Sequence, residues 1–460
     1  MSPRQDGSEY GHLATAARKV LLIAYYFPPR QSIASRRLGG VAKFLPESRW
    51  MPYVLTPKLP APADPRLHVV ETPYVGDVTR RIKRCLGLAP QRGLQQKFRF
   101  PPSVRENRAA APARVLNTVR SVLVYPDEER GWRRTAVQEG LRIAQGEGCS
   151  AIISSSSPVT AHIAARDLKR ATGLPWIADL RDLWTQNADY RYGVLRRVWE
   201  RRLERRVLGM ADCLVTVSAP LAEQLSSLHT HSRVVSIPNG YDPDEVSTQG
   251  TLDAEFSIVY TGHLYQGRMD PAPLFGALRE LLSEGTIDAN RTRVHFFGSR
   301  PNWLQYAVKE FRLDSVVELH GAVSREEAIR HQRSAQLVLL LNWTDPRQTG
   351  IYTGKLFEYL AARRPVLAIG GPKGVVTDLL ETTRAGRHVT GVTELKSLLL
   401  AWYSDFLRDG KVRYEGIEPE LAKYSQRAMA ERFAVLLDEV AADTARDGKA
   451  GMRVVPGQGG

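Results

Sequence analysis

Lys355 and Glu358 have the residue types and the spacing needed to hold a nucleotide diphosphate. They follow Gly354 in the stretch TGKLFEYLAARRPVLAIGG, where a helical pattern begins after a loop. The amino end of a helix carries unpaired N–H groups and a partial positive charge, and a glycine there lets a phosphate approach the backbone. Lys355 adds a full charge. Glu358, one turn further along, can accept hydrogen bonds from the hydroxyls of a ribose.

The same residues also suit an ordinary helix start. Thr353, which precedes Gly354, is a good N-cap residue, and a lysine and a glutamate are common in the first turn of a stable helix. The pattern by itself therefore leaves both interpretations open.

A second cationic candidate follows the expected strand 257–261, in the stretch GHLYQGR from Gly262 to Arg268. We assign Gly262 to the same donor site. Arg268 is near enough in sequence to supply a cation that, with Lys355, would offset the charge of a diphosphate without a metal ion. The alternative is an arginine on the solvated surface.

Two further candidates follow strand-like segments in the first half of the chain. His162 lies in a helix after the strand 151–154 and is expected to point toward a ligand, although a satisfied core or surface histidine fits equally. The serines before this helix are expected to cap it. Asp182 follows the strand 176–179 and could accept the proton of an attacking hydroxyl. Its alternative is an ion pair with a basic neighbour such as Arg181.

We expect neither a metal ion nor a bound cofactor. Asp242-Pro243-Asp244 imitates an Asp-x-Asp metal motif, but a hard cation needs several converging oxygen ligands, and these two residues lie in a polar turn. The glycines of the stretch GGPKG from Gly370 lack the Gly-Lys-Ser/Thr ending of a phosphate-binding Walker loop.

The elements that would position these residues alternate between strands and helices, which predicts parallel sheets covered by helices on both faces. The fold class is therefore α/β, with two Rossmann-like, doubly wound domains that face a cleft, and ligands are expected beyond the carboxyl ends of the strands. The expected strands are 19–27, 53–56, 151–154, 176–179, 213–217, 234–237, 257–261, 293–297, 316–319, 337–341 and 366–369.

The 460 residues exceed one ordinary core, and the turn Pro238-Asn239-Gly240 is the expected boundary between two domains. We predict a disordered tail at 1–17, a first Rossmann-like domain at 18–245, a second Rossmann-like domain at 246–442 and a second disordered tail at 443–460. The segment 58–125 carries basic clusters and allows no firm assignment of elements.

Cysteines and apolar segments indicate a cytoplasmic protein. The three cysteines are far apart and lack the pairing of a disulfide framework or a zinc site. The first apolar run, 20–27, is too short to span a bilayer and has no cleavage site of a signal peptide. A net charge of +15 would attract a polyanion or an anionic membrane.

The segment 192–207 combines apolar residues at helical spacing with six arginines. One face of such a helix is apolar and the remainder is cationic, which suits peripheral contact with an anionic lipid surface at the inner membrane face. A helix packed on the core with a solvated charged face is the alternative.

Four motifs in order resemble the GT-B glycosyltransferases of the retaining family 4 type, over about residues 19–440. They are YYFPP from Tyr25 with Ser32, Ser35 and Arg36, DLRDLW from Asp179, IPNGYD from Ile237, and the stretch from Thr353. The resemblance implies transfer of a sugar from a nucleotide diphosphate to an acceptor hydroxyl, in polysaccharide, lipid-linked glycan or glycoconjugate biosynthesis. It also implies that Glu358 holds the ribose and that His162 lies near the sugar. By the same resemblance, 18–245 is the acceptor domain and 246–442 is the nucleotide-sugar donor domain.

The chain departs from the family pattern at two places. The first glutamate of the family's paired-glutamate motif falls at Gly350, and His263 and Gln266 occupy the positions of the family's phosphate-binding Arg and Lys. Two other functions remain as alternatives. A nucleotide-sugar epimerase would have the same fold and need no acceptor, and a nucleic-acid-binding protein would use the basic surface.

Overall fold

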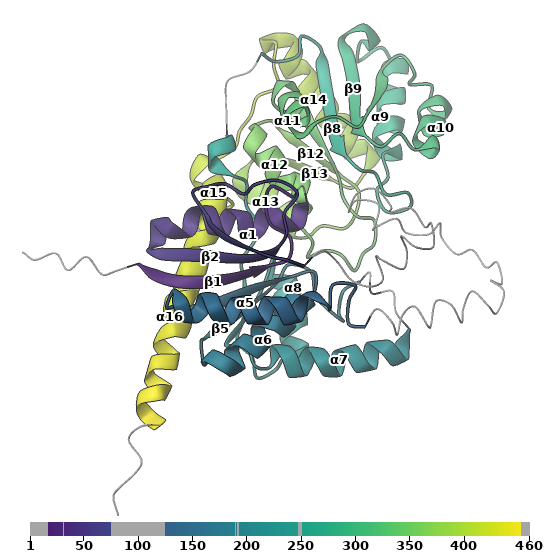
Figure 1. The fold of residues 1–460 in the computed structure, drawn as a ribbon. Coiled ribbons are helices and arrows are strands. Elements are labelled where there is room, and N and C mark those ends of the chain that lie inside the picture. The colour runs from purple at the N-terminus through teal and green to yellow at the C-terminus, as the bar shows by residue number, and fades with distance from the viewer. Residues whose placement is uncertain are drawn as a thin grey trace, which may run out of the picture.

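The computed structural model describes residues 17–30, 32–74, 125–188, 190, 193–246 and 251–451. Within them the chain forms two parallel sheets, each covered by helices on both faces (Figure 1). This agrees with the predicted doubly wound α/β fold. The basic cluster from Arg80 and nearly all of the predicted tail at 1–17 lie outside the described residues.

The first sheet has the strand order β3-β2-β1-β4-β5-β6-β7. Its strands are β1 (Arg18–Ala24), β2 (Trp50–Pro57), β3 (His68–Thr72), β4 (Ala151–Ser156), β5 (Trp176–Leu180), β6 (Cys213–Thr216) and β7 (Val234–Ser236). The helices around it are α1 (Ile33–Phe44), η1 (Leu45–Ser48), α5 (Trp132–Gly146), α6 (Thr160–Thr172), α7 (Val194–Leu208) and α8 (Ala219–Leu228).

The second sheet has the order β10-β9-β8-β11-β12-β13. Its strands are β8 (Phe256–Gly262), β9 (Thr292–Gly298), β10 (Val317–Gly321), β11 (Leu337–Leu341), β12 (Val366–Ile369) and β13 (Gly386–Val389). The other elements are η2 (Pro243–Glu245), α9 (Ala272–Ser283), η3 (Ala289–Arg291), α10 (Asn302–Glu310), α11 (Arg325–Ser334), α12 (Gly354–Ala362), α13 (Val375–Thr383), α14 (Val392–Asp409), α15 (Glu418–Ala422) and α16 (Gln426–Gly451).

The central strands are apolar along their whole length because helices cover both of their faces. All five residues of β11, Leu337–Leu341, are buried, and so are the last five of β1. The predicted strands all occur, with shifted ends. β3 and β13 were not predicted, since these edge strands carry polar residues, for example His68 and Glu71 in β3 and Arg387 in β13.

The last helix returns to the first domain. Met429, Phe433 and Leu437 of α16 pack in one core cluster with Val20 and Leu22 of β1. The predicted donor domain, 246–442, therefore contains residues that pack on the first sheet. Helix α16 also continues to Gly451, so the expected disordered tail from 443 begins as helix.

The chain crosses between the domains at two adjacent places. Tyr241 pairs with Ser425, the Tyr241 N–H donates to Tyr424 O at 3.0 Å, and the Gln426 N–H donates to Tyr241 O at 2.7 Å. A Cβ on Gly240 would lie 2.3 Å from the Ser425 carbonyl carbon, so only glycine fits there. The predicted turn at 238–240 is thus one of two paired crossings.

Two other predictions concern metals and membranes. Asp242 and Asp244 both form ion pairs with Lys43 at 2.7 Å, an arrangement that accounts for this Asp-x-Asp sequence without a metal ion. Cys149 and Cys213 are buried free thiols. Among the residues that the structure describes, no helix has the length and apolarity to cross a membrane.

Candidate functional site

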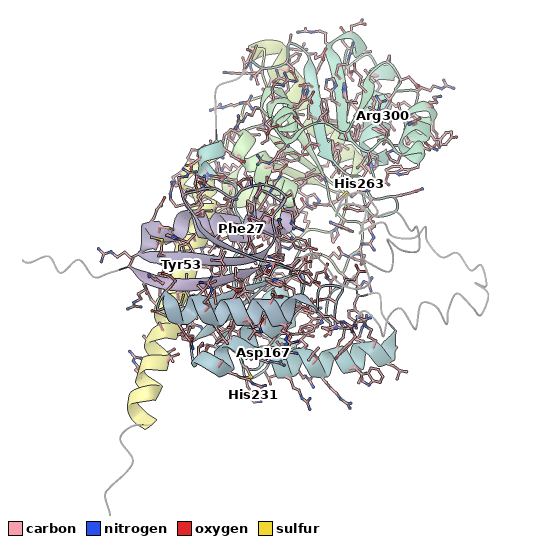
Figure 2. All side chains as sticks on the ribbon, in the orientation of Figure 1. Phe27, Tyr53, Asp167, His231, His263 and Arg300 are labelled. Atoms are coloured by element: carbon pink, nitrogen blue, oxygen red, sulfur yellow. The ribbon has the colours of Figure 1, made fainter. Side chains whose placement is uncertain are left out.

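Lys355 lies directly beneath Gly262, at the point where β8 ends. Its ammonium donates to the Tyr260 hydroxyl at 2.9 Å and to His263 O at 3.4 Å. A Cβ on Gly262, whose φ is +114°, would lie 2.4 Å from Lys355 Cε. The glycine therefore makes the space that the lysine occupies. His263, beside this site, lies on the side of the second domain that faces the first (Figure 2).

Burial lowers the pKa of Lys355, and nearby Tyr359, Tyr265 and Glu358 partly oppose this effect. No ion-pair partner within 4 Å occurs for this ammonium among the described residues. A partly buried cation held only by neutral groups attracts an anion, since the anion would compensate for its lost hydration.

The amino end of α12 is open to a ligand. Thr353 is the N-cap residue, but its hydroxyl does not accept a hydrogen bond from the first turn. This hydroxyl is buried and has no hydrogen-bond partner in the described part of the chain. Gly354 is the first residue of the helix. Thr353 therefore occupies the N-cap position without capping the helix through its side chain. The Leu356 N–H donates to Thr353 O at 3.1 Å, so the N–H groups of Gly354 and Lys355 are the first-turn donors that remain for an anion.

Glu358 contacts the first domain. Arg36 of α1 forms an ion pair with Glu358 Oε1, and Gln332 Nε2 of α11 lies 3.5 Å from Glu358 Oε2. The Glu358 side chain is 23% exposed and that of Arg36 is 37% exposed, so both remain within reach of a ligand. The carboxylate predicted to hold a ribose is thus directed at the boundary between the domains.

Gly350, at the position expected for the family's first glutamate, lies against the first domain. Its carbonyl accepts a hydrogen bond from the Ser218 hydroxyl at 2.6 Å, across the domain boundary. A Cβ at this position would lie 3.1 Å from Pro220 Cβ and 3.2 Å from Ser218 Oγ. A glutamate would therefore press against the start of α8, because the two domains touch at Gly350.

Arg268 lies on the loop after β8 and packs its guanidinium over the Trp343 ring, 5.0 Å from the ring centroid. Its carbonyl accepts a hydrogen bond from the Thr344 N–H at 2.9 Å. Arg268 thus joins the loop after β8 to the loop after β11. Tyr265 also stacks on Trp343, with ring centroids 5.7 Å apart.

His162 is fully buried in α6. Trp176 Nε1 donates to Ser154 Oγ at 2.8 Å, and this hydroxyl lies 2.8 Å from His162 Nδ1. In the tautomer in which this hydroxyl donates its hydrogen to Nδ1, the imidazole proton is on Nε2. Nε2 has no partner among the described residues. Burial lowers the pKa of His162 to about 4, against the opposing charge of Asp179, so the ring is neutral at pH 7.

The serines expected to cap α6 do not do so. Asp127 accepts hydrogen bonds from the Thr160 N–H at 2.8 Å and from the Thr160 hydroxyl at 2.7 Å. Asp127 precedes α5, which packs beside α6, so a residue distant in sequence caps the helix. The serines remain near the carboxyl end of β4.

Asp182 is 47% exposed and forms an ion pair with Arg181 at 2.7 Å, the alternative that the sequence left open. Its role as a base stays a prediction. Asp179 differs, because it is fully buried, paired with Arg37 at 2.9 Å, and accepts a hydrogen bond from Ser155 at 2.7 Å. That buried pair fixes the ends of β4 and β5 to α1.

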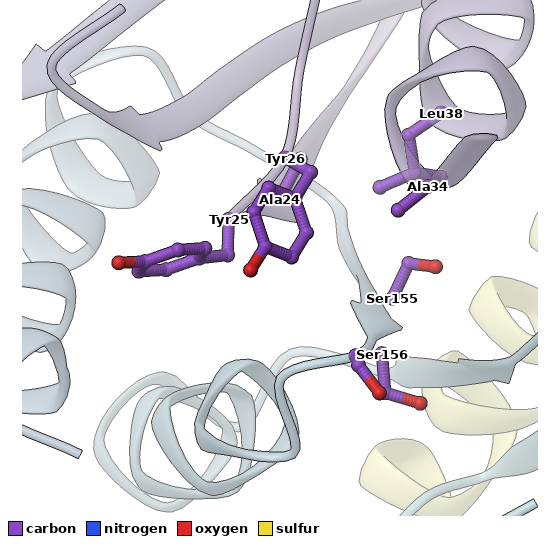
Figure 3. A pocket seen from close by; sticks show the side chains of 8 residues that line it. Ala24, Tyr25, Tyr26, Ala34, Leu38, Ser155 and Ser156 are labelled. Carbon is purple, nitrogen blue, oxygen red and sulfur yellow. The ribbon is translucent and has the colours of Figure 1, made fainter. Parts of the chain in front are cut away.

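A small cavity of about 10 Å³ lies beside these strand ends (Figure 3). This is roughly the space of one water molecule. Its lining comes from the end of β1, the start of α1 and the end of β4, namely Ala24, Tyr25, Tyr26, Ala34, Leu38, Ser155, Ser156 and Ser157. The YYFPP motif and the serine segment thus meet at one place in the first domain.

Among the predicted site residues, the structure brings Gly262, Gly354, Lys355 and Glu358 together on the second domain. His162 and Asp182 follow neighbouring strands of the first sheet. Sequence reasoning did not identify Tyr260 and Gln332 as site residues. It named Arg36 only as part of the motif that begins at Tyr25. Arg36 could have been selected as a cation of the motif that follows the first strand, but the sequence does not show that it meets Glu358.

Comparisons with known proteins agree with this arrangement. Residues 34–245 match the sequence profile of Glycosyltransferase Family 4. Sucrose-phosphate synthase from Thermosynechococcus elongatus has a TM-score of 0.56 and 15% identity, covering 93% of this chain and 100% of that chain. A glycosyltransferase from Rickettsia africae has a TM-score of 0.55 and 13% identity, covering 92% and 98%.

Anabaena Alr3699/HepE in complex with UDP and glucose has a TM-score of 0.52 and 14% identity, covering 92% of this chain and 100% of that chain. A comparison with curated protein sequences found no match. Residues 34–245 thus resemble Glycosyltransferase Family 4 in sequence, and the chain shares the two-domain fold of these solved glycosyltransferase structures.

Proposed function

We propose that this glycosyltransferase transfers a sugar from a nucleotide diphosphate to an acceptor hydroxyl, with retention of anomeric configuration. The observation that carries the proposal is the position of Lys355 beneath Gly262, at the amino end of α12, with Glu358 one turn further along. The similar Anabaena protein is described with UDP-glucose, which supports a nucleotide-diphosphate donor.

In this proposal Lys355 and the first-turn N–H groups of α12 stabilise the charge that develops on the leaving diphosphate. A bound diphosphate would favour the charged lysine and so raise the pKa that burial lowers. Arg268 would supply a second cation, and Glu358 would accept hydrogen bonds from the ribose. No metal ion is required for these steps.

The first domain would supply the groups around the sugar and the acceptor. His162 would act as a neutral donor through Nε2, in the tautomer whose Nδ1 accepts from Ser154, since Nε2 has no partner among the described residues. Asp182 would receive the acceptor proton only if its ion pair with Arg181 opened. The leaving diphosphate is the other candidate for that proton. Movement about the paired crossings at 241 and 425 would exclude water.

Calorimetric titration with a panel of nucleoside diphosphates, beginning with UDP, tests the donor site. Lys355→Ala should weaken binding by roughly tenfold or more, since a hydrogen bond to a charged group contributes about 1.5–3 kcal/mol. Glu358→Ala should weaken it by about fivefold to tenfold through lost ribose contacts.

Lys309→Ala and Glu310→Ala are matched controls, because both side chains are exposed on α10 of the same domain. They should bind the preferred nucleotide as the wild type does. Unchanged affinity in both Lys355→Ala and Glu358→Ala would refute the donor-site assignment.

We also propose that α7 docks on an anionic membrane surface, so that the enzyme works at the cytoplasmic face on a lipid-linked acceptor. Val194, Leu195, Val198 and Trp199 are 80, 76, 44 and 55% exposed at the start of the helix. Five arginines beside them are also exposed: Arg197, Arg201, Arg202, Arg205 and Arg206. The helix lies on the side of the first domain that faces away from the second domain (Figure 1).

The inward face of α7 argues for this occupant. In the first turns of α7, Arg196 and Glu200 are buried whereas Val194, Leu195, Val198 and Trp199 point to solvent, which reverses the usual orientation of a helix on a core. Towards its carboxyl end the helix packs on the core in the usual way, through Val207 and Leu208. An apolar stripe flanked by arginines has the chemistry of an interfacial helix.

Co-sedimentation with vesicles of phosphatidylcholine, with and without phosphatidylglycerol, tests the docking. Binding should require the anionic lipid, and Arg201→Gln with Arg205→Gln should weaken it roughly 30-fold, at about 1 kcal/mol for each arginine near the surface. Leu195→Ser with Trp199→Ser should also weaken it. Tyr306→Ser, an exposed aromatic on α10, is the control. Equal binding to neutral vesicles, or by the variants, would contradict the proposal.

The match to a glycosyltransferase family favours transfer over the two alternatives considered from the sequence. The titrations also separate them. Release of a rearranged free sugar without an acceptor would identify an epimerase, and steeply salt-dependent binding of an oligonucleotide would identify a nucleic-acid-binding protein.

A further inference from the structure

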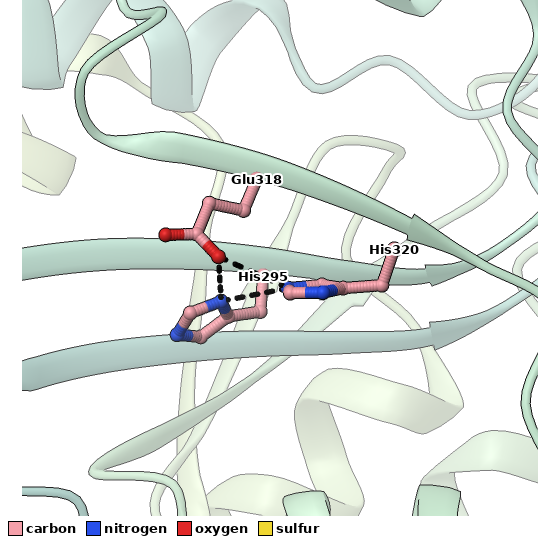
Figure 4. Close-up of side chains that lie close together, drawn as sticks. All are labelled: His295, Glu318 and His320. Carbon is pink, nitrogen blue, oxygen red and sulfur yellow. Dashed lines mark hydrogen bonds and ion pairs between the residues drawn. The ribbon is translucent and has the colours of Figure 1, made fainter.

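A cluster of two histidines and a glutamate lies on the two outermost strands at one edge of the second sheet (Figure 4). His295 is on β9, and Glu318 and His320 are on the neighbouring strand β10. His295 pairs directly with Glu318 in the parallel register. The three side chains lie on one face of the sheet and direct one ligand atom each toward a common point.

The distances among these three atoms suit a bound cation. His295 Nδ1 lies 3.0 Å from His320 Nε2, and Glu318 Oε2 lies 3.4 Å from His320 Nε2 and 3.6 Å from His295 Nδ1. Tetrahedral zinc has bonds of about 2.0–2.2 Å to nitrogen and oxygen, which set its ligand atoms about 3.4 Å apart. A hydrogen bond between the two imidazoles would account for only one of the three distances.

Neighbouring groups hold the two rings in position. Glu255 Oε1 lies 3.6 Å from His295 Nε2, the nitrogen that faces away from the cluster. A carboxylate there retains the Nε2 proton and leaves the Nδ1 lone pair for a metal, as is common for histidine ligands. The His320 ring stacks on Phe297 with centroids 4.4 Å apart, and His331 of α11 lies on the same Phe297 ring at 4.1 Å.

The cluster is open enough for exchange with solvent. The side chains of His295, His320 and Glu318 are 15, 32 and 48% exposed. Arg293 Nε lies 3.7 Å from Glu318 Oε1, the carboxylate oxygen that does not face the imidazoles. A cation held by the three ligand atoms could therefore keep a water molecule as its fourth ligand.

We propose that His295, Glu318 and His320 form a binding site for one divalent transition-metal ion, with Zn²⁺ the expected ion. Two imidazoles and one carboxylate favour Zn²⁺ over Mg²⁺ or Ca²⁺, which prefer oxygen ligands. The bound ion ties β10 to β9 at the edge of the sheet. No metal was expected from the sequence. The spacing of 295 and 318 does not reveal that their strands are neighbours in the sheet.

Titration of the full chain, stripped with a chelator, tests this site with Zn²⁺ by calorimetry and with Co²⁺ by visible absorption. We expect one equivalent of each ion and the strong visible bands of tetrahedral Co²⁺. His295→Gln and His320→Gln should each weaken Zn²⁺ binding by at least about 100-fold, since even loss of an outer partner costs 10–100-fold. Glu255→Gln should weaken it by about tenfold.

His231→Gln is the matched control, since His231 is an exposed histidine of the first domain (Figure 2). It should leave stoichiometry and affinity unchanged. Zn²⁺ should also raise the Tm of the wild-type protein, a measurement that decides the question even if a variant fails to fold. The proposal is overturned by the absence of saturable binding, by equal affinity in His295→Gln, or by the weak visible absorption of six-coordinate Co²⁺.

Discussion

At the scale of single residues, the donor site depends on a glycine that makes room for a lysine. Gly262 and Lys355 are 93 positions apart in sequence. The Lys355 side chain nevertheless fills the space that a Cβ on residue 262 would occupy. Sequence reasoning selected both residues from separate motifs. It could not show that they touch, because no local pattern encodes which loop lies over which helix.

Gly262→Ala should weaken binding of the preferred nucleoside diphosphate by roughly tenfold and lower the Tm. The new Cβ would displace Lys355 Cε, now 2.4 Å away, and alanine at a φ of +114° adds strain of about 1–3 kcal/mol. Calorimetric titration and a thermal melt measure the two effects.

Gly267→Ala separates strain from displacement. Its φ is also positive, at +73°, but a Cβ there meets no atom within 4 Å. It should lower the Tm and leave nucleotide affinity near that of the wild type. Equal loss of affinity in both variants would mean that Lys355 is not the reason for the glycine.

The positions of His162 and Asp182 in the fold could be inferred from the sequence, but their environments could not. Their places after β4 and β5 follow from the alternation of strands and helices. The burial of His162, and the pairing of Asp182 with Arg181, depend on packing and on side-chain conformations that the sequence pattern does not specify.

At the scale of elements, α7 shows how an amphipathic pattern can be interpreted in either direction. Residues 196, 200 and 204 form one stripe at helical spacing, and the apolar residues form another. The charged stripe faces inward because buried hydrogen-bond donors of the first domain lie within reach of its carboxylates. Glu200 accepts from Trp184 Nε1 at 3.3 Å, and Glu204 accepts from the Thr185 N–H at 3.2 Å.

Glu204→Leu should destabilise the first domain by about 1–3 kcal/mol, because it leaves the Thr185 N–H and hydroxyl buried without an acceptor. The Tm should fall by about 2–4 °C for each kcal/mol in a domain of this size. Differential scanning calorimetry measures the shift.

Glu204→Gln keeps one acceptor oxygen and should lose less stability than Glu204→Leu. Arg205→Leu, on the exposed side of the same helix, is the control and should change the Tm little. A higher Tm for Glu204→Leu would show that packing outweighs the hydrogen bonds to Thr185.

At the scale of the whole molecule, the fold could largely be predicted, and the contacts between its halves could not. Alternation of apolar runs and helical patterns was enough for two doubly wound sheets. The contact of Arg36 with Glu358, and that of Ser218 with Gly350, depend on the relative placement of the domains. No periodicity within either domain carries that information.

The return of α16 to the first domain affects how the protein is made. The face of β1 that carries Val20 and Leu22 is completed by residues near 429–440, so more than 400 residues separate the two parts of one core. On the ribosome, a partly translated chain would cover that face with Leu38 and Val41 of α1 but would lack the contacts of α16 while the second domain emerged. The core of the first domain is therefore completed only after the last helix has been translated.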